Sequence, residues 1–420
     1  MAYRFPRMRD VRQRFDTTRV DDIPGTVHRQ LQSLCLQNCV SPGQSVAVTA
    51  GSRGIANIAV ILREAVAALR ALGAVPFVVP AMGSHGGGTV EGQLEVLRGL
   101  GVTEESVGAP IRATMDTVVV AHTSSGIPVH FDRFAREADH VLIVNRVKPH
   151  TRFVGPIESG LHKMMLIGLG KHEGAKVYHG GIMSCSFSEM IHSVAEQVLR
   201  SCSVIGGLAI LENAVDETAL IEAVRPERFA EREPELLKLA CRWLPGLPVD
   251  NVDLLIVDRI GKNISGVGMD ANIVGRKFND HSATADDVAR CLRIMVRSLT
   301  PETHGNGTGI GMAEFTTQHC VDQIDPVKTR INCMTSLHPE VAMIPITFPT
   351  DAEAVEGALQ TIGMIAPQNA RVVQIQDTLH LTDTRVSEAC FPLVEASDRL
   401  EFTSDPYVFP VDSSGRLSDV

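Results

Sequence analysis

The chain has 420 residues, of which 44% are hydrophobic and 21% are charged, and its formal net charge is −10 at pH 7. This length exceeds one ordinary hydrophobic core, so we expect two domains. The globular composition argues against disorder, and the acidic balance argues against nucleic acid or a membrane surface as a partner. No secretory leader pattern and no run near the ~18 apolar residues of a membrane span are present, which favours a soluble, unexported protein.

The cysteines favour a reducing compartment. They number nine and form no C-x-x-C pair, which is typical of buried structural thiols in a cytoplasmic protein. Cys35 and Cys39 have the spacing of two metal ligands on a helix, but no second pair completes a four-ligand site.

The first predicted unit is a strand over residues 44–51 followed by an amphipathic helix over 52–74. The turn between them, residues 49–54, offers backbone N–H groups, hydroxyls and the Arg53 guanidinium at a helix N-terminus, which would suit an anion. A plain tight turn is the alternative, because the turn has neither a P-loop lysine nor a full dinucleotide fingerprint.

A second strand, over residues 74–83, leads into a glycine-rich loop that carries His85, and a helix follows over 90–99. A histidine among glycines at the carboxyl end of a strand suits proton transfer. The alternative is a histidine that only caps the following helix.

A short hairpin over residues 116–130 precedes a buried strand over 140–145, which runs into Lys148, Pro149 and His150. Parallel strands would bring His85 and His150 to one edge of the sheet. Open α/β sheets bind their ligands at this edge.

The stretch from Arg146 to Gly181 is rich in histidine, lysine and glycine. Lys163 follows His150 by thirteen residues, and His179 follows Lys163 by sixteen. Glycines here would let the backbone approach a bound group closely. A basic loop with solvated lysines and hydrogen-bonded histidines is the alternative.

A helix over 186–200, a strand over 203–213 and a charged helix over 226–244 complete the first half. The proline- and glycine-rich segment that follows indicates a domain boundary near residue 248, so we expect domains over 1–248 and 249–420. The second domain begins with a strand and a glycine-rich loop containing Lys262, which could neutralise a substrate carboxylate or simply face solvent. We expect helices over 285–299 and 352–365 and a strand over 370–375, and we assign no role to the loop at 304–315.

With Arg53, His85, His150, Lys163 and His179 in this order, the chain resembles the LarA family, the nickel-dependent lactate racemase and its homologues. The resemblance implies two α/β domains with an active-site cleft between them. It also implies a nickel-pincer nucleotide, a pyridinium-3-thioamide-5-thiocarboxylic acid mononucleotide, as the cofactor.

The resemblance further implies residue roles. Lys163 would carry the cofactor through a thioamide, His179 would bind nickel, and His85 and His150 would be the acid/base pair. Ser52 and Arg53 would contact the cofactor, and Arg53 and Lys262 would contact the substrate.

Two segments depart from the prototype. The prototype of the family, the lactate racemase, has an acidic residue in the turn before the arginine, where this chain has Ala50-Gly51-Ser52. The prototype also has a glycine pair before the family lysine, where this chain has Ser159-Gly160-Leu161-His162. His162 and His172 are further imidazoles that compete for the ligand assignment.

The chemistry independently requires such groups. Inverting a 2-hydroxy acid by hydride transfer needs a base for the hydroxyl proton on each side of a planar 2-keto acid, and an imidazole with a pKa of ~6.5 can act as either base or acid near neutral pH. Imidazole is also a fitting donor for square-planar nickel. The implied partners are a small lactate-like 2-hydroxy acid and the proteins that make the cofactor.

Two other functions stay open. His85, His150 and His179 could bind a hydrolytic zinc, with Lys163 stabilising an oxyanion. Alternatively, the chain could be a non-enzymatic anion- or nucleotide-binding protein whose histidines have no chemical role.

Overall fold

The computed structural model describes residues 5–52, 54–182 and 186–420. The chain forms two compact units, one over Asp16–Leu244 and one that joins Met1–Phe15 to Pro245–Val420. We call them the N-unit and the C-unit. Each contains a sheet and helices, so the predicted α/β class is confirmed. No helix within the described residues is both long enough and apolar enough to cross a membrane.

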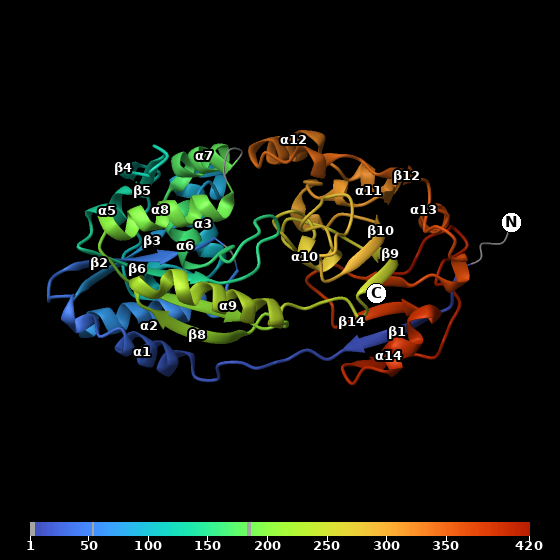
Figure 1. The fold of residues 1–420 in the computed structure, drawn as a ribbon, viewed down its shortest axis with the longest axis horizontal. Helices are drawn as coiled ribbons and strands as arrows, with labels where there is room; N and C mark the ends of the chain where they lie inside the picture. The colour runs from blue at the N-terminus through green and yellow to red at the C-terminus, as the bar shows by residue number, and fades with distance from the viewer. Residues whose placement is uncertain (1–4, 53, 183–185) are drawn as a thin grey trace. The chain divides into compact units, whose positions relative to one another are not determined.

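A five-stranded sheet organises the N-unit, in the order β3-β2-β6-β7-β8 (Figure 1). The first four strands run parallel, and β8 pairs antiparallel with β7. The carboxyl ends of β2, β3 and β6 therefore share one edge, as the sequence predicted. The strands are β2 Ser45–Ala50, β3 Val75–Pro80, β6 His140–Arg146, β7 Val204–Glu212 and β8 Thr218–Val224.

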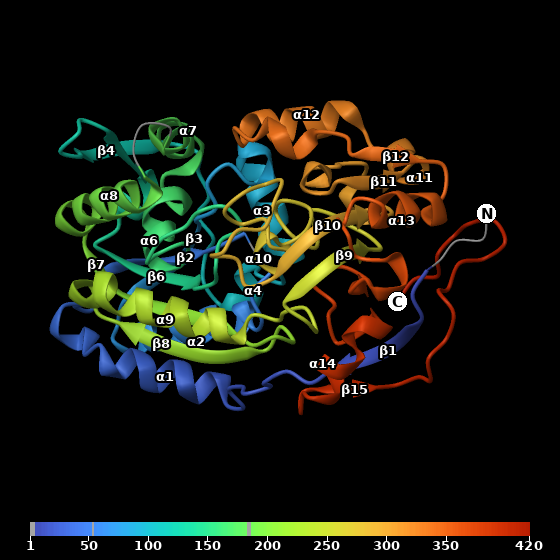
Figure 2. The ribbon, with the colours of Figure 1, turned by 45° about the vertical axis from the view of Figure 1, so that its right-hand side comes forward.

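Helices cover both faces of this sheet because its strands are apolar on both sides. Val46 and Val48 of β2 lie in the cluster built with α1 and α2, while the intervening Ala47 lies in the cluster built with α8 and α9. The layers can be followed in Figures 1 and 2. The helices are α1 Ile23–Ser33, α2 Ile58–Ala71, α3 Val90–Gly99, α4 Glu104–Val107, α8 Phe187–Ser201 and α9 Phe229–Trp243.

The helix after β2 begins later than predicted. We expected it from residue 52, but α2 begins at Ile58, after Asn57 in a left-handed conformation with φ 62°. The amide of Ala56, in the turn before α2, donates to the Glu212 carboxylate at 2.7 Å. Glu212 therefore holds the segment that links the expected anion cradle, residues 49–54, to α2.

A small antiparallel ribbon, β4 Thr117–His122 and β5 Pro128–Asp132, confirms the predicted hairpin. The short α5 Arg133–Glu137 follows it. Downstream of β6 come α6 Leu161–Lys163, a π-helical turn over Met164–Gly168, and α7 Lys171–Ile182. Single π-turns are uncommon and are frequent at functional sites.

The C-unit has an eight-stranded mixed sheet, in the order β12-β11-β10-β9-β13-β14-β1-β15. The strands are β1 Met8–Gln13, β9 Asn251–Val257, β10 Arg290–Val296, β11 Phe315–Thr317, β12 Ile346–Phe348, β13 Val372–Ile375, β14 Asp383–Ser387 and β15 Leu400–Phe402. The helices are α10 Ala271–Val274, α11 Gln318–Asp322, α12 Pro326–Thr335, α13 Asp351–Leu359 and α14 Phe391–Glu395.

Two predictions for this unit need correction. The helix expected over 285–299 is wrong, because this segment contains the strand β10, which pairs in parallel with β9. The buried residues of β10 divide between the cores on the two faces of the sheet, so the segment lacks the simple alternation that would have indicated a strand. The first domain was expected to start at residue 1, but β1 pairs with β14 and β15 and so belongs to the C-unit.

The thiols are also less buried than expected. The eight described cysteines are free, but Cys39 and Cys241 are exposed and Cys35 is half-buried. Cys35 and Cys39 flank a short 3-10 turn instead of sharing an α-helical face, so the helical metal-ligand spacing does not occur.

Candidate active site at the strand ends

His85 lies in the loop after β3, and its imidazole Nδ1 is hydrogen-bonded to the Ser52 Oγ in the turn after β2. The loop needs glycine: Gly86 has φ 67°, and a Cβ there would lie 2.4 Å from the Gly92 carbonyl carbon. His85 makes no capping bond to the turn it precedes. Thr89 caps α3 instead, because its Oγ1 accepts from the Gly92 N–H at 3.1 Å. The helix-cap alternative for His85 is therefore wrong.

The Ser52 hydroxyl fixes the orientation of an otherwise exposed imidazole. We expect Ser52→Ala to lower the turnover of a substrate handled by His85 by about five-fold, because a hydrogen bond of this kind contributes about 1 kcal/mol. Steady-state kcat measures the effect, and intact mass checks that cofactor loading is unchanged. Ser33→Ala, on α1, is the matched control, and equal kcat in both variants would contradict the orienting role.

His150 is held by its own loop. Its backbone N–H donates to the Glu158 carboxylate at 2.8 Å, and its Nδ1 accepts from the N–H groups of Arg152 and Phe153, each at 3.1 Å. Because Nδ1 is an acceptor, a neutral His150 ring carries its proton on Nε2. One tautomer is thus selected before any ligand arrives.

The Phe153 ring joins His150 to Lys163. The His150 ring stacks on it with centroids 4.3 Å apart, and the Lys163 Nζ lies 5.5 Å from its centroid. Phe187 of α8 stacks on the same ring at 3.7 Å, which fixes Phe153 in place. Lys163 is half-buried at the start of the π-helical turn.

The turn with Ser52 lies against the segment with Lys163. A Cβ on Gly51 would come 3.4 Å from the Asn145 Oδ1 and 3.4 Å from the Met164 Cε. Asn145, at the end of β6, also donates to the Gly160 carbonyl at 2.7 Å. The Ser52–His85 pair and the Lys163 segment are therefore neighbours at one sheet edge.

His162 is a structural imidazole. It is 2% exposed, and its Nδ1 lies 2.5 Å from the Glu233 carboxylate of α9. Gly160 has φ 90°, and a Cβ there would lie 2.0 Å from the same carboxylate. This pair anchors the turn before Lys163, and its burial removes His162 from the candidates for a ligand.

Two of the predicted site residues lie wholly or partly outside the described part of the structure. Arg53 lies outside the described residues. The backbone of His179 lies in α7, but its side chain is outside the described part of the structure. The neighbouring Tyr178 is fully buried, and its hydroxyl accepts from the His130 N–H at 2.9 Å, which ties α7 to β5.

Burial raises the pKa of Tyr178 to about 12. Between pH 10 and 12 the unfolded chain releases this proton while the folded chain keeps it, so stability should fall as pH rises, by up to about 3 kcal/mol. Urea unfolding at pH 9 and above measures the slope. Tyr178→Phe should remove this part of the slope, and an unchanged slope would contradict the assignment.

Lys262 lies in the C-unit and does not simply face solvent. Its half-buried ammonium donates to the Asn332 Oδ1 at 2.7 Å and to the Gly266 carbonyl at 2.9 Å. The Thr308 Oγ1 donates to the same Asn332 oxygen at 2.9 Å. A cation is therefore held in a glycine-rich polar environment.

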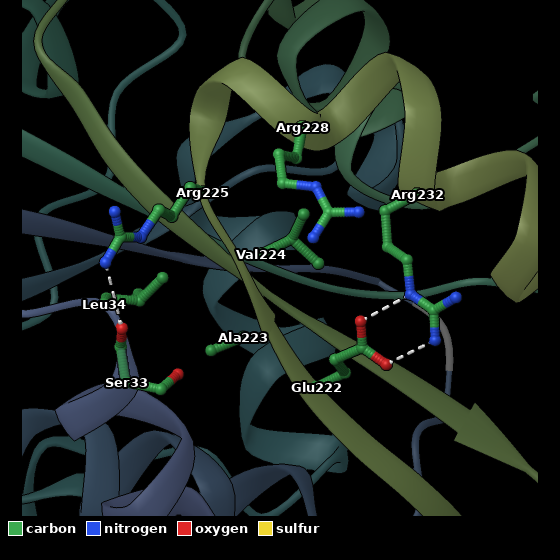
Figure 3. Close-up of a pocket in the computed structure, with 8 residues that line it drawn as sticks. All are labelled: Ser33, Leu34, Glu222, Ala223, Val224, Arg225, Arg228 and Arg232. Carbon is green, nitrogen blue, oxygen red and sulfur yellow. Dashed lines mark hydrogen bonds and ion pairs between the residues drawn. The ribbon is translucent and has the colours of Figure 1, made fainter.

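Two other polar clusters contain none of these residues. In the N-unit, a cavity of about 330 Å³ contains three arginines, and Figure 3 shows the Arg232 guanidinium paired with Glu222. Among the described side chains, one group of three or more could hold a metal ion: Asp280, His338 and Glu340 of the C-unit, with ligand atoms within 4.8 Å of one another. No group of this kind among the described side chains contains His85 or His150, so the zinc alternative would need the side chain of His179, which is outside the described part.

Comparisons with known proteins give a family-model match over part of the chain and a shared fold. The profile of the lactate racemase N-terminal domain matches residues 16–190. No curated protein matches the sequence significantly.

Two solved structures resemble this one at low identity. The lactate racemase apoprotein from Thermoanaerobacterium thermosaccharolyticum is 12% identical, with a TM-score of 0.52 over 88% of this chain and 93% of that one. A crystal structure of a Thermotoga maritima protein is 12% identical, with a TM-score of 0.49 over 86% and 96% of the two chains. At this identity the first likeness shows a shared fold.

Proposed function

Because the profile of the lactate racemase N-terminal domain matches residues 16–190, we propose that the chain belongs to that family and is an isomerase that racemises or epimerises a 2-hydroxy acid. One observation carries the proposal: three reactive side chains belong to loops and turns at one edge of the N-unit sheet. His85 follows β3, His150 follows β6, and Lys163 contacts the same Phe153 ring as His150. Two imidazoles and a half-buried amine at one sheet edge are more than an anion-binding loop requires.

The two histidines would move the hydroxyl proton. In one direction, one imidazole takes the proton from the substrate hydroxyl as the carbon loses hydride, which leaves a planar 2-keto acid. The other imidazole, in its protonated form, would then give a proton to the keto oxygen as hydride returns to the opposite face of the carbon. His150 is held in place by the contacts of its loop, and His85 by its bond to Ser52.

The residues present fit the nickel-pincer nucleotide implied by the family. Lys163 offers a half-buried amine against the Phe153 ring, which suits attachment of a flat pyridinium. His179, on α7, has the chemistry of a nickel ligand. When bound, such a cofactor supplies a site that accepts and returns hydride, while the protein supplies orientation and proton transfer.

A fixed cation would hold the substrate carboxylate. Arg53 and Lys262 are the proposed partners, with Ser52 and Arg53 close to the cofactor. The half-buried Lys262 supports this role, because its hydrogen bonds to Asn332 and Gly266 fix the position of the charge.

A panel of 2-hydroxy acids tests the activity. Protein made together with the cofactor pathway is incubated with each enantiomer in ordinary and deuterated water, and the products are separated by chiral chromatography. We expect inversion of at least one acid with its carbon-bound hydrogen retained. Inversion with deuterium at that carbon would point to proton exchange, and no inversion by loaded protein across the panel would count against the proposal.

A further inference from the structure

Lys171 is a cation that the proposed chemistry does not use. Its side chain is fully buried, and its ammonium donates to the Pro80 carbonyl at the end of β3 and to the Gln93 Oε1 at 3.2 Å. It also forms an ion pair with Asp132, 3.0 Å away. The backbone of Lys171 is left-handed, with φ 53°, a conformation that residues other than glycine rarely adopt.

Gln93 transmits this arrangement to the loop of His85. It is fully buried on α3, and its Nε2 donates to the Gly83 carbonyl at 2.9 Å and to the His85 carbonyl at 3.5 Å. The side-chain amide therefore joins the buried ammonium to the loop on both sides of Ser84. No second polar side chain of the described residues makes these two loop contacts.

Such a buried pair is expensive to form. Removing two charges from water costs several kcal/mol each, and a well-packed apolar pair would serve stability at least as well. Burial accordingly raises the pKa of Asp132 and lowers the pKa of Lys171, while each charge partly offsets the shift of the other. A left-handed lysine adds backbone strain, which persists where a structure over-determines a position.

We propose that Lys171 is a positioning residue for His85, acting through Gln93. The ammonium orients the Gln93 amide, and the amide fixes the loop so that the His85 imidazole meets Ser52. The pair with Asp132 is neutral overall, so this role concerns geometry and does not depend on the charge seen by substrate. The inference depends on the proposed function only for its kinetic effect.

The test compares Lys171→Met with Lys176→Met. Lys176 lies on the same helix, but its side chain is 61% exposed, so its variant controls for the loss of a lysine. In the loaded enzyme, Lys171→Met should lower kcat by about 10- to 100-fold, as expected for a misplaced group. KM and the mass of the loaded chain should change little, and Lys176→Met should match the wild type.

A second measurement works on unloaded protein and needs no activity. The ring ¹⁵N shifts of His85, assigned by their loss in His85→Gln, should show one tautomer bonded to Ser52 in the wild type and an averaged ring in Lys171→Met. Unchanged shifts in a folded Lys171→Met would overturn the proposal, even if its thermal stability falls. If the wild type racemises nothing, the proposed function fails, and the shifts still decide this inference.

Gln93→Leu covers the case in which Lys171→Met does not fold. It keeps the Lys171–Asp132 pair but removes the amide, and with it both the bond from the Lys171 ammonium and the bonds to the loop. The same change in the His85 shifts is expected. A wild-type His85 spectrum in Gln93→Leu would overturn the proposal.

Discussion

His85→Gln and His150→Gln should each lower kcat by about 10²- to 10⁴-fold, the range that general acid–base catalysis contributes. Each glutamine keeps a polar side chain of similar reach but cannot exchange a proton near neutral pH. Because inversion needs proton transfer on both faces, either variant should lose both directions of the reaction. Chiral chromatography of each enantiomer measures both.

The cofactor should remain attached in both variants, since neither residue is its proposed attachment point. Intact mass therefore separates a chemical defect from a loading defect. His28→Gln is the control, because His28 pairs with Glu64 between α1 and α2. Wild-type kcat in either site variant, with the cofactor loaded, would remove that histidine from the mechanism.

The sequence predicted which residues lie at the sheet edge, because the end of a strand depends on residues that are close together in the chain. Apolar runs bounded by glycines gave β2, β3 and β6, and their parallel order follows from the helices between them. The same pattern failed at β10, where a helical period and a buried strand give similar apolar runs. It also could not place β1, because its partners β14 and β15 lie more than 350 residues away.

The partners of the site residues were not predictable from spacing. Ser52 meets His85 across 33 residues, and Glu158 and Phe153 hold His150 through a turn that has no sequence signature. The Lys171 network joins residues 91 and 78 positions apart, and a lysine between glycines suggests an exposed loop until burial is known. The bond between Glu212 and the Ala56 amide, two residues after the expected anion turn, was likewise not predictable, because it forms only when β7 joins the sheet.

Lys163→Arg should abolish covalent loading and, with it, all racemisation. Arginine keeps the positive charge and much of the length, so it preserves the contact with Phe153, but its guanidinium stays protonated and is therefore a poor nucleophile. Intact mass of protein made with the cofactor pathway should show an adduct in the wild type and in Lys176→Arg, and none in Lys163→Arg. Wild-type protein made without the pathway fixes the mass of the unmodified chain.

The same experiment separates the three functions that the sequence left open. A zinc hydrolase would hold stoichiometric zinc and show no adduct in any variant, and an anion-binding protein would show neither. An adduct that persists in Lys163→Arg would move the attachment to another residue, and the half-buried amine beside Phe153 would then have no assigned role. Only loss of the adduct at this one lysine connects the geometry of the N-unit sheet edge to the chemistry proposed for it.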